Sequence, residues 1–198
     1  GPDDNIFIYF TDHGAAGLVA FPEGVMVIYI EACESGSMLE GLLPDNINVY
    51  ATTASNAEES SYACYYDEKR QTYLGDVYSV VWMEDSDAEK IDTETLFKQF
   101  QVTQDKTNTS HVMQYGDLKL GAAQMVAEFQ GELEPLSKPP KNPTVDYYNG
   151  LLKRDAVATE DVRLSIVARR LAASESDSEN QKQLQKELEQ LLQVLLLF

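Results

Sequence analysis

Two continuous runs of apolar residues dominate the first part of the chain. One is NIFIYF, from Asn5 to Phe10, and the other ends in IYIEA, from Ile28 to Ala32. Runs that are apolar throughout, rather than alternating with polar residues, are typical of strands buried on both faces of a parallel sheet. The pattern therefore predicts an α/β fold with a mostly parallel central sheet.

A glycine-bearing turn follows each run and carries one residue of chemical interest. His13 lies in the turn from Thr11 to Gly14, and Cys33 lies just before a turn that contains Gly36. Ligands collect at the carboxyl ends of the strands in parallel sheets, so neighbouring strands would bring this thiol and imidazole together. An imidazole can take the thiol proton and later protonate a leaving amine, which is the chemistry of a cysteine peptidase.

Taken one at a time, these residues have simpler explanations. A lone cysteine in an apolar strand is usually a small core hydrophobe, and a histidine before a glycine is commonly a turn residue. The repeated order of strand, turn and glycine favours the catalytic interpretation for Cys33 and His13. His111 lacks that setting and is predicted to be structural, while Cys64, in the tyrosine-rich YACYY, is predicted to be a structural or pocket-edge thiol.

A helical pattern occupies the segment from Asp92 to Phe100. Asp92 is the predicted N-cap, and Leu96, Phe97 and Phe100 fall on one apolar face. Just before this segment, Trp82 and Met83 are predicted to be core residues.

The acidic run from Glu84 to Asp87 is predicted to be a solvated turn, because it lacks the spaced oxygen ligands and central glycine of a calcium loop. The stretch from Glu134 to Thr144 has the composition of a Pro-rich linker.

A second helical pattern begins near Ser178. Ser176 and Glu179 form a capping-box pattern at its start. The leucines that recur at helical spacing are Leu184, Leu188, Leu191, Leu192 and Leu195. On periodicity alone this segment is a plain amphipathic helix.

Composition narrows the classes of partner. The chain has 198 residues, 43% of them hydrophobic, which is enough for one sizeable domain. Its formal net charge of −18 argues against a nucleic-acid partner and fits an acidic compartment, where protonation relieves repulsion between carboxylates. Two cysteines make no disulfide framework, and Asn108 begins an N-glycosylation sequon. No membrane span, metal site or cofactor is predicted.

Six sequence segments resemble the legumain family, the asparaginyl endopeptidases among the caspase-like cysteine peptidases, and they are nearer to its animal members than to its plant members. The segments are FIYFTDHG (7–14), YIEACESGSM (29–38), LPDNINVYATTASN (43–56), ESSYACYYDEKR (59–70), YLGDVYSVVWMEDSD (73–87) and TNTSHVMQYGD (107–117). The resemblance implies a caspase-like three-layer α/β/α fold, incomplete here, followed by a helical pro-segment.

The resemblance also implies roles for individual residues. Cys33 would be the nucleophile and His13 its base, while the backbone N–H groups of Cys33 and Gly14 would form the oxyanion hole. Asp12 matches an aspartate that the family can convert to a succinimide. Glu31, Ser61 and Asp76 would form the pocket for the substrate Asn side chain, although a surface strand end for Glu31 and a loop cap for Asp76 are the simpler interpretations without the family.

The chain departs from the family pattern in three places. The family's stretch before FIYFTDHG is missing, and a family helix is missing between Gly24 and Val25. The short link that remains predicts that the two strands can hardly pair in parallel. At the family's activation site, Glu175 replaces asparagine, with Asp177 and Asn180 nearby as substitutes.

The expected organisation has three parts. Residues 1–134 form a partial catalytic domain, 135–161 a linker with the start of an activation peptide, and 162–198 the rest of that peptide with the first prodomain helix. The expected activity is cleavage after Asn, and less readily after Asp, through an acyl-enzyme, with peptide ligation as a side reaction. The expected partners are peptide and protein substrates, cystatin-type inhibitors and the chain's own prodomain. The expected location is a lysosomal, endosomal or vacuole-like acidic compartment reached by the secretory route, with secretion as the alternative.

Two alternatives stay open. The chain could be a catalytically incomplete fragment that only binds peptides or inhibitors. A caspase with Asp specificity is disfavoured, because the sequence around Cys33 reads EACESG rather than the caspase QACxG.

Overall fold

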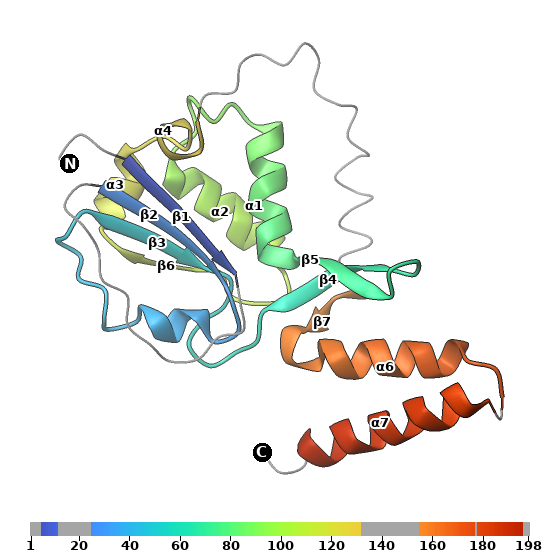
Figure 1. The fold of residues 1–198 in the computed structure, drawn as a ribbon. Coiled ribbons are helices and arrows are strands. Elements are labelled where there is room, and N and C mark those ends of the chain that lie inside the picture. The colour runs from blue at the N-terminus through green and yellow to red at the C-terminus, as the bar shows by residue number, and fades with distance from the viewer. Residues whose placement is uncertain (1–4, 12–24, 132–154, 177, 196–198) are drawn as a thin grey trace.

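The two apolar runs are neighbouring strands of one sheet. The computed structural model describes residues 5–11, 25–131, 155–176 and 178–195. A four-stranded sheet has the order β1-β2-β3-β6, in which β1 (Asn5–Thr11), β2 (Val25–Glu31) and β3 (Val49–Thr53) are parallel and β6 (Met113–Gly116) is antiparallel to β3 (Figure 1). The prediction of a mostly parallel sheet is confirmed. The carboxyl ends of β1, β2 and β3 therefore meet at one edge.

The expectation that β1 and β2 could hardly pair in parallel is wrong. They pair along their whole length, from Asn5 opposite Val25 to Thr11 opposite Glu31. A parallel connection only has to return the chain to the start of the next strand, and a strand of 7 residues is roughly 23 Å long. A link the length of residues 12–24 can span roughly 45 Å when extended, so its length permits the pairing without a helix.

Both faces of β2 are buried, as its continuous apolar pattern predicts. Val27 and Tyr29 pack in one cluster with the helices, whereas Met26, Ile28 and Ile30 pack on the other face against the segment that follows β2. The first face is covered by α1 (Val77–Ala88), α2 (Leu96–Lys106), α3 (Leu118–Ala123) and α4 (Ala127–Gln130), and the second by the short helix η1 (Ser35–Met38) and its flanking chain (Figure 1).

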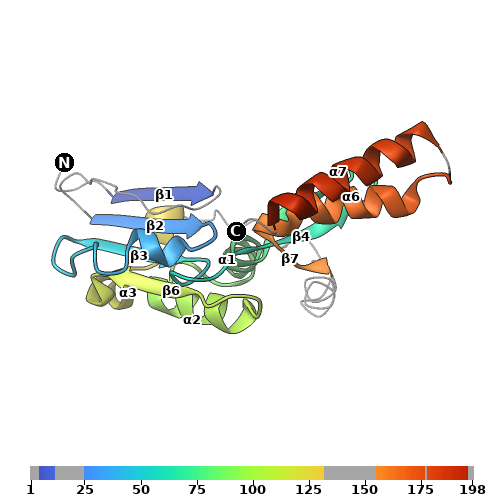
Figure 2. The same cartoon turned by 90° about the horizontal axis from the view of Figure 1, so that it is seen from below.

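A second, smaller sheet extends from this body. It has the order β5-β4-β7, built from β4 (Tyr62–Asp67), β5 (Thr72–Asp76) and β7 (Val157–Ala158). After β7 come η2 (Thr159–Asp161), α6 (Val162–Ala173) and α7 (Glu179–Leu195). The last two helices pack on each other and lie to one side of the main sheet (Figure 2). The predicted linker at 134–144 lies outside the described residues.

The N-cap of α2 is Thr95, not the predicted Asp92. The Thr95 hydroxyl accepts a hydrogen bond from the Lys98 N–H at 3.1 Å. Thr95 also bridges to Met125, and the Leu96 N–H donates to the Gln124 carbonyl, so tertiary pairing holds Thr95 in an extended conformation directly before the helix. The predicted apolar face is correct for Leu96 and Phe100, which are buried, but Phe97 is 36% exposed.

Removing this cap gives a direct test of the assignment. Thr95→Ala is expected to lower the free energy of unfolding by about 1 kcal/mol, because the Lys98 N–H loses its acceptor. Asp92→Ala is the matched control and is expected to change the stability by less than about 0.5 kcal/mol. Urea unfolding of both variants measures the difference, and a larger loss for Asp92→Ala would restore the original prediction.

Two predictions about α1 are wrong. Met83 is 43% exposed, whereas its neighbour Trp82 is buried as predicted. The run from Glu84 to Asp87 belongs to the helix rather than to a turn, and Asp85 within it is only 1% exposed. An acidic run looks solvated in the sequence, but the helical period turns Asp85 toward the same side as Val81 and Trp82.

The cap of α7 is also shifted from the prediction. The Ser178 hydroxyl, rather than that of Ser176, accepts a hydrogen bond from the Gln181 N–H at 3.1 Å. Leu184 is buried and Leu188 and Leu191 are half-buried, but Leu192 is 45% exposed. The predicted amphipathic helix is therefore confirmed, with a narrower apolar face. The side chain of Leu195 lies outside the described residues.

Candidate active site

Cys33 lies just past the carboxyl end of β2, at the edge of the sheet where ligands are expected. Its thiol is partly buried, and its Sγ lies 3.7 Å from the Oγ of Ser61. Ser61 directly precedes β4 and is 2% exposed. The structure thus brings together two residues that the sequence assigned to catalysis and to the substrate pocket. His13, Gly14 and Asp12 lie outside the described residues.

The turn that carries Cys33 is held on both sides by Ser55. The Ser55 hydroxyl donates to the Ala32 carbonyl at 3.0 Å and accepts from the Ser35 N–H at 3.1 Å. The residue after the thiol, Glu34, has a φ of 51°, in the left-handed region. A non-glycine residue in that region is rare and needs support from its surroundings.

Glu31, the last residue of β2, is buried rather than on the surface. It is 2% exposed, and its Oε2 accepts hydrogen bonds from the backbone N–H and the hydroxyl of Ser79, both at 2.9 Å. Within the described residues its Oε1 has no hydrogen-bond partner. Burial, assisted by the negative charge of Asp76, raises the pKa of Glu31 to about 8 despite the bonds from Ser79.

Asp76 completes the group of predicted pocket residues. It ends β5, pairs with Ala63 across the hairpin and stands at the N-cap position of α1 without a side-chain capping bond. Its charge acts on Glu31, so the two carboxyl groups share one region. The surface-end interpretation of Glu31 and the capping interpretation of Asp76 are therefore not supported.

The C-terminal segment docks beside Ser61. The Ser61 carbonyl accepts from the Thr159 N–H at 2.9 Å, and the two hydroxyls lie 3.0 Å apart. β7 continues this contact by pairing antiparallel with β4, with Ala158 opposite Tyr62. Asp155 accepts hydrogen bonds from the backbone N–H groups of Tyr65 and Tyr66 at 3.4 and 2.7 Å.

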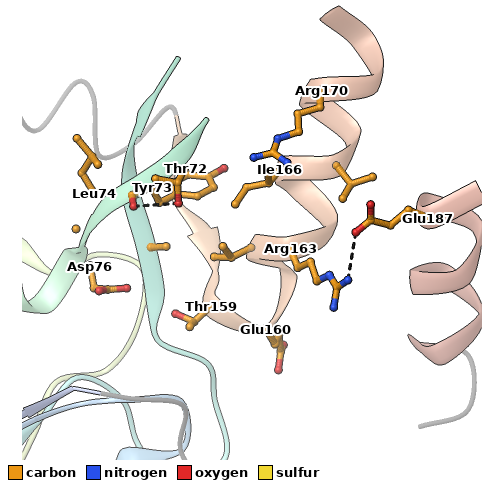
Figure 3. A pocket seen from close by; sticks show the side chains of 14 residues that line it. Thr72, Tyr73, Leu74, Asp76, Thr159, Glu160, Arg163, Ile166, Arg170 and Glu187 are labelled. Atoms are coloured by element: carbon orange, nitrogen blue, oxygen red, sulfur yellow. Dashed lines mark hydrogen bonds and ion pairs between the residues drawn. The ribbon is translucent and has the colours of Figure 1, made fainter. Parts of the chain in front are cut away.

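A pocket of about 650 Å³ lies between the β4–β5 hairpin and α6 (Figure 3). Asp76 and Thr159 contribute to its wall, and Arg163 forms an ion pair with Glu187 of α7 at 3.2 Å. Cys33, Glu31 and Ser61 do not line it. The pocket therefore does not contain the thiol, and its lining residue Thr159 contacts Ser61.

The remaining predicted residues have clear positions. Cys64 is a free, fully buried thiol packed with Val77 and Val81, as expected of a structural cysteine, and burial raises its pKa well above the ordinary value. Asn108 is exposed on the loop after α2. His111 is exposed and pairs with Glu59.

Sequence reasoning missed four residues that hold the site together. They are Ser55, Glu59, Ser79 and Thr159. Ser55 and Glu59 fall within the segments that resemble the family, but neither their residue type nor their spacing marks them as functional. Thr159 lies far along the chain from the other three residues. Among the described residues there is no cluster of His, Cys, Asp and Glu that could hold a metal ion.

A partly buried thiol just past the carboxyl end of a parallel strand lies at the edge of an α/β sheet where substrates bind, which suits a cysteine nucleophile. The model of the Peptidase C13 family matches residues 1–26 and 23–132, and the chain belongs to this family. The two matches meet at residues 23–26, next to the junction where a family helix was expected to be missing. The caspase-like α/β class is thereby confirmed.

Curated relatives agree with this family. The chain is 48% identical to Legumain of Homo sapiens over 91% of its own length and 45% of the relative. It is 39% identical to Hemoglobinase of Schistosoma japonicum, over 86% of the chain and 44% of the relative. With Vacuolar-processing enzyme of Vicia sativa the identity is 43%, over 61% of the chain and 31% of the relative. The chain thus spans less than half the length of these relatives. None of the helices in the described segments is long and apolar enough to cross a membrane.

Proposed function

We propose that this chain carries the catalytic part of a cysteine endopeptidase that cleaves after Asn and, less readily, after Asp. The observation that supports it best is the contact of the Cys33 thiol with Ser61 at the carboxyl edge of the sheet, next to the buried Glu31. The register of β1 and β2 adds support, because Thr11 pairs with Glu31 and His13 and Cys33 follow these two residues at the same offset in the sequence.

The proposed reaction has two steps. The Cys33 sulfur attacks the peptide carbonyl carbon while His13 takes the thiol proton, and the backbone N–H groups of Cys33 and Gly14 stabilise the oxyanion. The C–N bond breaks, the amine leaves with the proton from His13, and a thioester remains. Water then attacks the thioester with His13 as base, which releases the acid and restores the thiol. An amine in place of water would give peptide ligation.

Specificity would come from Glu31, Ser61 and Asp76. An Asn side chain has a donor end and an acceptor end, so its pocket must offer both kinds of partner. A carboxyl group with a pKa of about 8 is neutral at acid pH and presents an O–H, and the buried Oε1 of Glu31 is available for this role. A neutral Glu31 would also lower the repulsion toward a substrate Asp, so cleavage after Asp is expected at acid pH.

The segment from Asp155 to Asp161 is proposed to belong to a pro-segment that restricts access to the thiol. Its support is the pairing of β7 with β4 and the bonds of Thr159 to Ser61, the residue that touches Cys33. Peptides, cystatin-type inhibitors and the rest of the prodomain are the proposed partners. The proposed location is an acidic lysosomal or vacuolar compartment, which also suits a net charge of −18.

A matched set of fluorogenic peptides tests this function at mildly acidic pH. The peptides differ only in the residue before the scissile bond: Asn, Asp or Leu. Turnover is expected in the order Asn, then Asp, with Leu at least about 100-fold lower, because buried polar groups in the pocket would lose their partners. Preference for Leu would contradict the assignment of the pocket. Absence of turnover by the folded protein with all three peptides would favour the non-catalytic binding alternative.

A further inference from the structure

The loop between β3 and Ser61 makes close contact with the turn that carries Cys33. The Glu34 N–H donates to the Glu59 carbonyl at 2.8 Å, and the Gly36 N–H donates to the Ser55 carbonyl at 3.1 Å. A Cβ at Gly36 would lie only 2.7 Å from the backbone carbon of Asn56. The turn and the loop therefore pack backbone to backbone, and a movement of one must move the other.

The carboxylate of Glu59 holds this loop from its outer side. Its Oε1 accepts the N–H of Asn56 at 3.0 Å and that of His111 at 2.7 Å, and its Oε2 lies 2.8 Å from the His111 Nδ1. The Asn56 bond closes the loop on itself, and the two His111 contacts fasten it to the chain that leads into β6. The Ser110 hydroxyl adds a bond to the Ala54 carbonyl at 2.7 Å.

The pKa shifts of Glu59 and His111 agree with this arrangement. Partial burial pulls the pKa of Glu59 upward, but the hydrogen bonds from Asn56 and His111 outweigh it and the net shift is downward. The hydrogen bond and charge of Glu59 raise the pKa of His111. Glu59 and His111 are titratable groups that face each other. At mildly acidic pH the two therefore carry opposite charges.

We propose that Glu59, fastened by His111, is a positioning residue for the Cys33 thiol. Through its carboxylate it fixes the loop, through its carbonyl it supports the left-handed Glu34 next to the thiol, and two residues later the same loop presents the Ser61 hydroxyl to Sγ. The proposed effect of Glu59 on catalysis rests on the proposed function, whereas its proposed stabilisation of the turn that carries Cys33 does not.

The experiment has two arms. In the first, kcat and KM for the Asn peptide are measured for the full chain and for Glu59→Ala. A fall in kcat of about 10- to 100-fold with KM raised less than about threefold is expected, because the thiol is displaced while Glu31 and Asp76 stay in place and, of the three proposed pocket residues, only Ser61 moves with the loop. His111→Gln keeps the backbone N–H and is expected to lose only about two- to threefold in kcat.

The second arm needs no turnover. Amide hydrogen exchange of Glu34 and Gly36, resolved by NMR, is expected to quicken at least about tenfold in Glu59→Ala, while exchange in β2 stays unchanged. Glu58→Gln is the matched control, because the Glu58 side chain is exposed and makes no hydrogen bond or ion pair within the described residues. It should match the wild type in both arms.

The outcomes separate the two proposals. If the wild type turns over no peptide, the proposed function fails and the exchange arm alone decides whether Glu59 holds the turn. Exchange of Glu34 and Gly36 equal to that of the wild type, or an unchanged kcat in an active enzyme, overturns the positioning role. If Glu59→Ala does not fold, Glu59→Gln replaces it. This variant keeps one acceptor oxygen, so about threefold faster exchange is expected, and wild-type exchange rates would again overturn the proposal.

Discussion

Cys33→Ser is expected to abolish peptide turnover while leaving the fold intact. The hydroxyl is a far weaker nucleophile at the same position, so kcat/KM should fall by roughly four orders of magnitude or more. Stability should change little, because Cys33 is only partly buried and its packed neighbour, Ser61, can hydrogen-bond to a hydroxyl as well as to a thiol. Fluorogenic assay and thermal melting of the same preparation measure the two effects.

The second cysteine supplies the matched control. Cys64 is fully buried between Val77 and Val81, and its raised pKa keeps the thiol protonated and unreactive. Cys64→Ser should therefore retain turnover in the folded fraction but lose about 1 to 3 kcal/mol of stability, because a hydroxyl is placed in an apolar cluster. The opposite pattern, with Cys64 needed for turnover and Cys33 needed for folding, would refute the assignment of the nucleophile.

Glu31→Gln is expected to make the protein more stable at pH 8 and to flatten its stability profile against pH. The folded-state pKa of Glu31 is about 8, against an ordinary value of 4.5. The folded protein therefore binds this proton more tightly than the unfolded chain. As pH falls from about 8 to about 4.5, this group alone adds stability with a slope of up to roughly 1.4 kcal/mol per pH unit.

The glutamine variant lacks this proton, so it should keep its stability at neutral pH and gain less on acidification. Some slope should persist, since burial also raises the pKa of Glu94 to about 7. Urea unfolding at intervals between pH 5 and pH 8 measures the profiles, with Glu58→Gln as the exposed control. A wild-type protein that loses stability between pH 8 and pH 5, or a glutamine variant with the wild-type slope, would contradict the raised pKa of the buried Glu31.

Local pattern predicted β1 and β2 because each is a continuous apolar run, and for β2 this pattern reflects burial on both faces of the strand. It failed where a three-dimensional partner decides the outcome. Thr95 replaces Asp92 as the cap of α2 because Thr95 and Met125 bridge, and no signal near Asp92 reports that contact. Asp85 is buried although its neighbours are acidic, because the side of a helix that faces the core depends on what packs there.

In the candidate site, too, some residues could be named from the sequence and others only from the structure. Motif resemblance named Cys33, Glu31, Ser61 and Asp76, and the structure places Cys33 in contact with Ser61 and Glu31 within the electrostatic influence of Asp76. It could not name Ser79, which holds Glu31 through two hydrogen bonds, nor Glu59, which closes the loop before Ser61. Supporting residues of this kind carry no residue type or spacing that distinguishes them from ordinary surface or turn positions.

By itself the sequence determined the family, the strand that leads to Cys33 and the residue types at the candidate site, because these follow from segments that resemble the family and from short-range periodicity. Only the tertiary structure decided the contacts that make a site: Ser61 with Cys33 across 28 positions, Glu31 with Ser79 across 48, and Thr159 with Ser61 across 98. Such contacts depend on the path of the whole chain, since burial and hydrogen bonding between distant segments are fixed only when the sheet and its covering helices have assembled.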